Sequence, residues 1–204
     1  MSSSLVAQIL RLRTQIFLRR RAWQRRRQPA LPPNADAITP QLVVGAFIDE
    51  ADWRQLFNQG IRVVVSLQGE RHDEDTFGEL QPTGYLRLPT PDFNPPTLAQ
   101  LRMGAAFINE AIRAGEIVLV HCHAGVGRST MQCAAYLMLN GMELDAAWEL
   151  IKSKRIKAVW NERQEATMQA FAAALMVERQ DIAGELVPKA DLAATTEQRE
   201  LREE

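Results

Sequence analysis

The sequence predicts an α/β domain, with a mainly parallel central sheet and helices on both sides. Short apolar runs alternate with amphipathic segments of helical period along the middle of the chain, the pattern of parallel strands joined by crossover helices. The runs at residues 61–67 and 117–120 are rich in β-branched residues, as expected of strands buried on both faces. A glycine-containing loop follows the second run, and such sheets bind ligands at the carboxyl ends of their strands.

Length and composition fit one domain with tails. The chain has 204 residues, of which 46% are hydrophobic, which is typical of a globular protein. Its two cysteines, Cys122 and Cys133, do not form a disulfide framework and indicate a reducing, cytoplasmic compartment. Cys133 is expected in the core, about three helical turns along the helix after the loop, which is too far from Cys122 for an easy disulfide.

The charge is unevenly spread along the chain. Residues 1–28 hold eight arginines and no acid, while the remainder holds 16 basic and 25 acidic residues, a net charge of −9. This predicts a basic arm, helical if its apolar residues share a face, on an acidic domain. Three roles stay open for the arm: packing on its own domain or a partner, organelle targeting, or peripheral association with an anionic membrane surface. No membrane span and no nucleic-acid partner are expected.

The expected domain organisation is a linker at 29–41, a catalytic domain at 42–180 and a charged tail at 181–204. Strands are expected where β-branched and apolar residues run together, at 42–47, 61–67, 85–88 and 117–120. Helices are expected where apolar residues recur at helical spacing between capping and breaking residues, at 49–59, 97–114 and 129–139, then around 144–151 and 166–175. The loop at 89–96 has four prolines, which exclude helix and central strand.

The stretch at residues 117–130 carries the chemistry. Cys122 leaves the strand, two glycines turn the loop, and a helix begins near Ser129. Loop N–H groups and a helix N-terminus together bind anions and favour the thiolate form of a cysteine. Arg128 can grip a dianion through two parallel N–H groups, and the Ser129 hydroxyl can hydrogen-bond the sulfur. A small cysteine at a strand end is usually core, but the combination favours a phosphate cradle with a nucleophile and a phosphocysteine intermediate.

The segment from His121 to Ser129 resembles the His-Cys-x5-Arg-Ser/Thr signature of cysteine-dependent phosphatases, and is most similar to the dual-specificity group. The resemblance covers roughly residues 42–175. It implies that the chain hydrolyses phosphate monoesters without a cofactor or metal, and that its substrates are phosphotyrosine, phosphoserine and phosphothreonine in proteins. It also implies a phosphate-binding loop made of His123, Ala124, Gly125, Val126, Gly127 and Arg128.

Asp92, in the middle of the proline-rich loop, is the candidate general acid. It lies 30 residues before Cys122, and the resemblance implies that such an aspartate protonates the leaving oxygen and later activates water. The alternative is a solvated turn aspartate. The competing acids Asp73, Glu74 and Asp75 have charged neighbours, which favours an exposed helix start or loop.

Three further residues are assigned supporting roles. The resemblance implies that Glu70 orients the signature arginine, although an exposed surface position is an equal alternative. His121 is expected to hydrogen-bond the loop backbone and tune the thiolate. The side chain of His123 is expected at the rim, where the resemblance implies varied residues in protein-directed members and often lysine in lipid-directed ones, so His123 weakens the alternative of a lipid substrate.

One departure and two alternatives remain. Gln164 matches the second glutamine of a segment that tyrosine-specific enzymes use to position water, but Trp160 replaces the first, which argues against a tyrosine-only mechanism. The alternatives are a lipid phosphatase acting on phosphatidylglycerophosphate or a phosphoinositide, and a non-catalytic phosphate-binding module.

Overall fold

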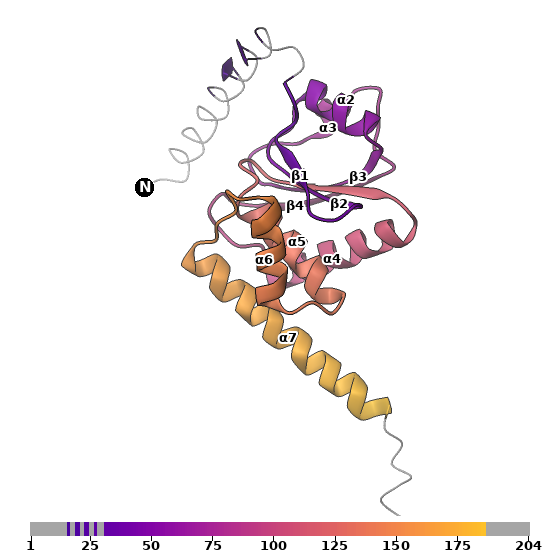
Figure 1. Cartoon of the computed structure of the whole chain (residues 1–204), viewed down its shortest axis with the longest axis vertical. Helices are drawn as coiled ribbons and strands as arrows, with labels where there is room; N and C mark the ends of the chain where they lie inside the picture. Colours follow the sequence, from indigo (N-terminus) through magenta and orange to yellow (C-terminus); the bar gives the residue numbers. More distant parts are fainter. Residues whose placement is uncertain (1–15, 17–18, 21–22, 25–26, 28–30, 187–204) are drawn as a thin grey trace, which may run out of the picture.

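The computed structural model describes residues 31–186 and, before them, residues 16, 19, 20, 23, 24 and 27 (Figure 1). These six are helical and exposed, and the Arg27 guanidinium lies 4.0 Å above the Trp23 ring. The rest of the basic arm predicted at 1–28, and the tail from residue 187, lie outside the described residues. No helix in the described ranges is long and apolar enough to cross a membrane.

Five strands form one sheet: β1 (Ala35–Ala37), β2 (Leu42–Gly45), β3 (Ile61–Gln68), β4 (Gly84–Thr90) and β5 (Ile117–His121). Their order is β1-β2-β5-β3-β4. Only the pair of β1 with β2 is antiparallel, while β2–β5, β5–β3 and β3–β4 are parallel. The mainly parallel sheet predicted from the sequence is therefore confirmed. The strand that precedes the glycine loop lies at its centre.

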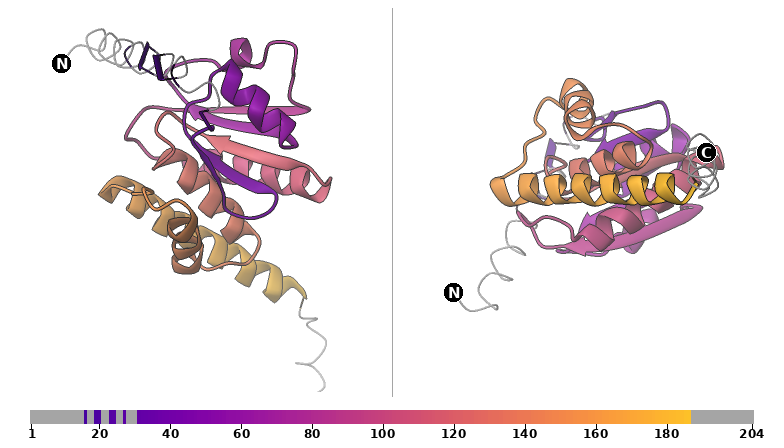
Figure 2. Two further views of the ribbon diagram at one scale, coloured as in Figure 1. Left: turned by 45° about the horizontal axis from the view of Figure 1, so that its top comes forward. Right: turned by 90° about the horizontal axis from the view of Figure 1, so that it is seen from below.

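Helices cover both faces of the sheet, as predicted (Figures 1 and 2). One side carries α2 (Glu50–Asn58) and the short α3 (Glu74–Phe77); the other carries α4 (Leu98–Arg113), α5 (Arg128–Leu139), α6 (Leu144–Lys154) and α7 (Glu162–Leu186). Side chains of a strand alternate between the faces. Leu119 of β5 accordingly joins the smaller core beneath α2, while Val118 and Val120 join the larger core beneath α4 and α5.

Two helices begin with reciprocal capping. Thr97 accepts a hydrogen bond from the Gln100 N–H, and the Gln100 side chain accepts from the Thr97 N–H. Asp49 and Asp52 make the equivalent pair at the start of α2. Each pair satisfies two backbone donors that have no partner within the helix. The helix start predicted at Thr97 is therefore confirmed.

Three predicted boundaries need correction. The expected linker at 29–41 contains β1, which joins the sheet only through pairing with β2 and has no strand pattern of its own. The strand predicted to end at residue 88 continues through Pro89 to Thr90. A proline is tolerated there because β4 is an edge strand. The tail expected from residue 181 begins inside α7, which runs on to Leu186 because no proline interrupts it before Pro188.

The packing of α4 on α5 gives a prediction at Gly104. A Cβ added there would lie 2.5 Å from Cδ of Gln132, a buried side chain that donates to the Leu101 carbonyl at 2.9 Å. Alanine gains about 1 kcal/mol in a helix, but overpacking costs about 1–3 kcal/mol. We expect Gly104→Ala to lower the free energy of unfolding in urea, and to be neutral or stabilising when combined with Gln132→Ala. Equal effects in both backgrounds would contradict this contact.

Candidate active site

Three predicted site residues meet because their strands are adjacent and parallel. Glu70 follows β3, Asp92 follows β4 and Cys122 follows β5, and the carboxyl ends of these strands share one edge of the sheet. Asp92 and Cys122 line a pocket of about 340 Å³, whose walls include Phe93, Val159 and Trp160. The structure therefore brings together residues that lie up to 52 positions apart in the chain.

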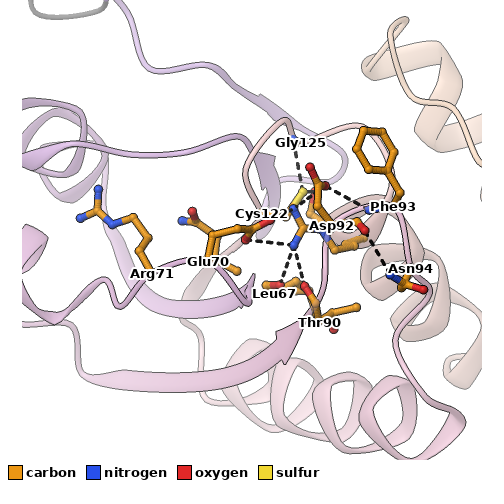
Figure 3. A network of polar contacts seen from close by, with 12 residues as sticks. Leu67, Glu70, Arg71, Thr90, Asp92, Phe93, Asn94, Cys122 and Gly125 are labelled. Carbon is orange, nitrogen blue, oxygen red and sulfur yellow. Dashed lines mark hydrogen bonds and ion pairs between the residues drawn. The ribbon is translucent and has the colours of Figure 1, made fainter. Parts of the chain in front are cut away.

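The Cys122 sulfur lies at the floor of this pocket. The side chain is 2% exposed, and the Gly125 N–H points at Sγ with a nitrogen–sulfur distance of 3.2 Å (Figure 3). Ser129 Oγ lies 3.4 Å from the same sulfur, and α5 begins with Arg128 immediately after the loop. A backbone N–H thus faces the sulfur and a helix N-terminus follows the loop, and both features favour negative charge.

The loop requires glycine at position 125. Its φ of +68° is rarely adopted by residues with a Cβ, and an added Cβ would lie 2.7 Å from the Gly45 carbonyl oxygen and clash with Nη2 of Arg155. This loop conformation turns the Gly125 N–H toward the sulfur and its carbonyl away from it. The predicted glycine turn is explained by this close approach.

Arg155 supports the loop on the side away from the sulfur, a role that no sequence pattern predicted. Its Nε donates to the Gly125 carbonyl at 2.5 Å, Nη1 to Asp36 at 2.6 Å and Nη2 to Asn34 at 3.2 Å. The side chain is fully buried. The partners on its far side come from β1 and the residue before it, a segment that was predicted to be linker. No local sequence signal marks this contact, because 119 positions separate Arg155 from Asp36.

Arg128 is buried among oxygen atoms. Its Nη1 donates to the Leu67 and Thr90 carbonyls at 3.4 and 2.6 Å, while its Nη2 lies 2.9 Å from Glu70 and 2.8 Å from Asp92 (Figure 3). Burial lowers the pKa of the guanidinium, but the Cys122 sulfur and the two carboxylates outweigh it, so the pKa is raised. Glu70 therefore lies against the arginine, as one of its two predicted alternatives required.

Asp92 sits on a tight turn at the pocket mouth. Its side chain is 20% exposed, and Oδ1 accepts from the Phe93 N–H at 3.1 Å. The turn closes with the Asn94 N–H donating to the Pro91 carbonyl at 3.1 Å. Phe93 has a φ of +63° and is the one non-glycine residue with positive φ in the described ranges. Asp92 thus lies beside Arg128 on a turn whose backbone is strained at Phe93.

Behind the loop lies a buried polar cluster that corrects two predictions. Asp73, expected to be exposed, is fully buried and accepts from Ser66 Oγ at 2.5 Å and Gln68 Nε2 at 3.1 Å. His121 was expected to bond the loop backbone; instead its Nε2 lies 3.3 Å from Asp73. The charged neighbours of Asp73 in the sequence gave no sign of this, because the aspartate turns inward beneath β3 and β5.

Three further positions singled out in the sequence, His123, Trp160 and Gln164, line the pocket wall. His123 is half-buried, and its ring meets Phe47 edge-on with centroids 6.4 Å apart. Trp160 is 7% exposed, donates from Nε1 to Thr130 Oγ1 at 2.9 Å and packs on Trp148. Gln164 approaches so closely that a Cβ on Gly127 would lie 2.9 Å from its Nε2. Trp160 thus forms part of the pocket wall at the position where the segment of tyrosine-specific enzymes has its first glutamine.

The Asp73 cluster predicts a pH dependence of stability. Burial raises the pKa of Asp73, but the charge of His121 and hydrogen bonds from His121 and Ser66 outweigh it, so the pKa lies below its usual 3.8. A lowered pKa contributes stability that is present above the usual value and is lost as pH falls through the folded value. We expect the unfolding free energy of the wild type to exceed that of Asp73→Asn by a constant amount near pH 5, and the difference to shrink toward pH 3. A difference that grows on acidification would contradict the ion pair.

Comparison with known proteins agrees with this geometry. The model of the dual specificity phosphatase catalytic domain matches residues 44–173. Human dual specificity phosphatase 28 is 30% identical over 152 residues, which cover 72% of this chain and 83% of that protein. Dual specificity protein phosphatase 22 of Xenopus tropicalis is 36% identical over 113 residues, covering 55% of this chain and half of that protein.

Solved structures show the same fold. The crystal structure of PTPMT1 in complex with PI(5)P superposes with a TM-score of 0.65 at 24% identity, covering 72% of this chain and 99% of that one. The family model covers well over half of the chain, and its range includes the cysteine loop, Asp92 and Glu70. The chain therefore belongs to the dual specificity phosphatase family, and its domain is that of a cysteine-based phosphatase.

Proposed function

We propose that this phosphatase hydrolyses phosphorylated tyrosine, serine and threonine side chains of proteins, with Cys122 as nucleophile and Asp92 as general acid. The observation that carries the mechanism is the placement of a cysteine sulfur, an arginine and a carboxylate around one pocket. The sulfur faces a backbone N–H, and the arginine lies beside the carboxylate. These are the groups that a phosphoryl transfer through cysteine requires.

In the first step, the Cys122 thiolate attacks phosphorus and the bond to the leaving oxygen breaks. Asp92, in its protonated form, gives its proton to that oxygen, so the product leaves as an alcohol or phenol. The phosphoryl oxygens accept hydrogen bonds from the loop N–H groups and from Arg128. A phosphate group would compete with Asp92 for the guanidinium, which would free the carboxyl group to face the leaving oxygen.

In the second step, water attacks the phosphocysteine. Asp92, now a carboxylate, takes a proton from that water, and the sulfur leaves as a thiolate while inorganic phosphate is released. Ser129 Oγ, 3.4 Å from the sulfur, can donate a hydrogen bond that stabilises the departing thiolate. The enzyme returns to its starting protonation state, and no cofactor enters the cycle.

The pocket walls support a phosphorylated side chain as substrate. Phe93, Val126, Val159 and Trp160 line it, and apolar walls above a charged floor suit an aryl or alkyl group that carries phosphate. Phe93 and Val159 are 64% and 59% exposed, so they are available to flanking residues of a peptide. The loop position that would add positive charge for a polyanionic head group holds His123 instead of lysine.

A lipid phosphate is the competing substrate. PTPMT1, whose structure has been solved in complex with PI(5)P, has the same fold, and the exposed apolar residues at the pocket mouth would also tolerate acyl chains. Phosphopeptides and phosphorylated lipids must therefore be compared directly as substrates.

The nucleophile assignment is tested by Cys122→Ser. We expect hydrolysis of p-nitrophenyl phosphate to fall by at least about a thousandfold, because residues that act as a catalytic unit lose most of their effect when one is removed. Cys133→Ala is the matched control and should keep activity, since burial raises the pKa of the Cys133 thiol and keeps it unreactive. Mass spectrometry of the quenched wild-type reaction should show phosphate on Cys122. Full activity of Cys122→Ser would exclude the mechanism.

The substrate class is tested with a panel of phosphopeptides, phosphoinositides and phosphatidylglycerophosphate, assayed by phosphate release. We expect higher kcat/KM for phosphopeptides, with phosphotyrosine and phosphothreonine both hydrolysed, and we expect Phe93→Ala to lower this value by raising KM. A higher kcat/KM for phosphatidylglycerophosphate or a phosphoinositide would overturn the protein assignment while leaving the cysteine mechanism intact.

A further inference from the structure

The turn that carries Asp92 does not hold its own shape through packing. Phe93 adopts a positive φ, which costs free energy for a residue with a large side chain. Its ring is 64% exposed, so burial of the ring does not offset this strain. The conformation must therefore be stabilised by contacts of the main chain.

Asn161 makes such a contact from a distant part of the sequence. Its Nδ2 donates to the Phe93 carbonyl at 2.9 Å, across 68 positions of sequence. The neighbouring Gln164 Nε2 reaches the Asn94 carbonyl at a longer 3.5 Å. The other hydrogen bonds of residues 92–94 come from within the turn or, at the Asp92 carboxylate, from Arg128. Asn161 therefore holds the strained peptide itself.

The orientation of the Asn161 amide is fixed by α7. Asn161 Oδ1 accepts from the Gln164 N–H at 3.1 Å, and the Asn161 N–H donates to Gln164 Oε1 at 3.2 Å, a reciprocal cap at the start of the helix. With the oxygen committed to an N–H, the amide nitrogen faces a carbonyl. In the opposite orientation the amide nitrogen would face the Gln164 N–H and the amide oxygen would face the Phe93 carbonyl, so neither pair could form a hydrogen bond. One side chain thus joins the helix start to the acid turn.

We propose that Asn161 is a positioning residue for the proton-transfer step: by donating to the Phe93 carbonyl it fixes the turn that aims Asp92 at the leaving oxygen. The proposal rests on the proposed function, in which Asp92 is the general acid. It makes the start of α7 part of the acid machinery, and it leaves the cysteine loop outside that role, since the side-chain hydrogen bonds of Asn161 among the described residues go to Phe93 and Gln164.

Two substitutions separate positioning from helix capping. Serine and aspartate cap helices about as well as asparagine, so Asn161→Ser and Asn161→Asp keep an oxygen for the Gln164 N–H. Both lose the amide N–H that donates to Phe93, and the serine hydroxyl lies on a shorter side chain. Serine is neutral and aspartate is charged, so an effect common to both cannot arise from charge. Asn58→Ser, at an exposed position at the end of α2, is the matched control.

The readout is kcat/KM for a series of aryl phosphates with leaving groups of increasing pKa, because protonation matters most for the poorest leaving groups. For Asp92→Asn we expect kcat/KM to fall steeply as the pKa of the leaving group rises. For Asn161→Ser and Asn161→Asp, kcat/KM for the poorest leaving groups should fall by about tenfold to a hundredfold. This is part of the roughly 10²–10⁴-fold that general acids contribute. The kcat/KM values for the best leaving groups and the melting temperatures of both variants should stay near those of the wild type. In the Asp92→Asn background, Asn161→Ser should add nothing.

The outcomes distinguish a failure of the positioning role of Asn161 from a failure of the acid role of Asp92. One outcome is that both Asn161 variants keep the wild-type dependence of kcat/KM on leaving-group pKa while Asp92→Asn steepens it. In that case Asn161 only caps α7 and this proposal is wrong, although the proposed function stands. If Asp92→Asn itself leaves the dependence unchanged, Asp92 is not the acid and the proposal falls with that assignment. An effect of equal size at both ends of the series would show a structural defect, and would also overturn it.

Discussion

The rest of the site depends on one buried charge, the guanidinium of Arg128. Removing such a group from water costs several kcal/mol unless charges and hydrogen-bond acceptors compensate it. Here two carboxylates and two backbone carbonyls do so, and they come from the ends of β3 and β4. Satisfying Arg128 therefore fixes the segments after these strands against the start of α5, which sets Asp92 and Glu70 around the pocket that holds the Cys122 sulfur.

The cysteine loop is supported from two further directions by polar groups that the core would otherwise exclude. Arg155 donates a hydrogen bond to the Gly125 carbonyl and forms an ion pair with Asp36 on β1. Asp73 lies beneath His121 at the end of β5. Such groups persist in a core only when they are paired. The Gly125 N–H thus faces the sulfur while its carbonyl is held on the other side by Arg155.

The sequence was most informative where the chemistry is local. Cys122, Arg128 and Ser129 follow one another through a strand, a glycine turn and a helix start, so short-range propensities predict their arrangement. Asp92 was identified because the family resemblance implies a general acid on such a loop, at a similar spacing before the cysteine. Arg155 and Asp73 were not identified as parts of the site, because Arg155 acts through partners 119 positions away and Asp73 turns inward only once β3 and β5 pair. β1 was missed for the same reason, since its pairing with β2 is the signal. In each case the missing information is tertiary packing, which overrides local pattern.

In the proposed mechanism, phosphate binding and proton donation are built on different parts of the fold. The cradle belongs to β5 and α5, whereas the acid turn follows the edge strand β4 and contacts the residue that caps α7. That helix packs against α4, α5 and α6, and Arg179 on it donates to the Met138 carbonyl of α5 at 2.6 Å. The position of Asp92 is thus set relative to α5 by two routes, directly through Arg128 and indirectly through α7 and Asn161. In the proposed mechanism only the first route involves a group that substrate phosphate would engage, so the second route is the one that would keep Asp92 in place while phosphate binds Arg128.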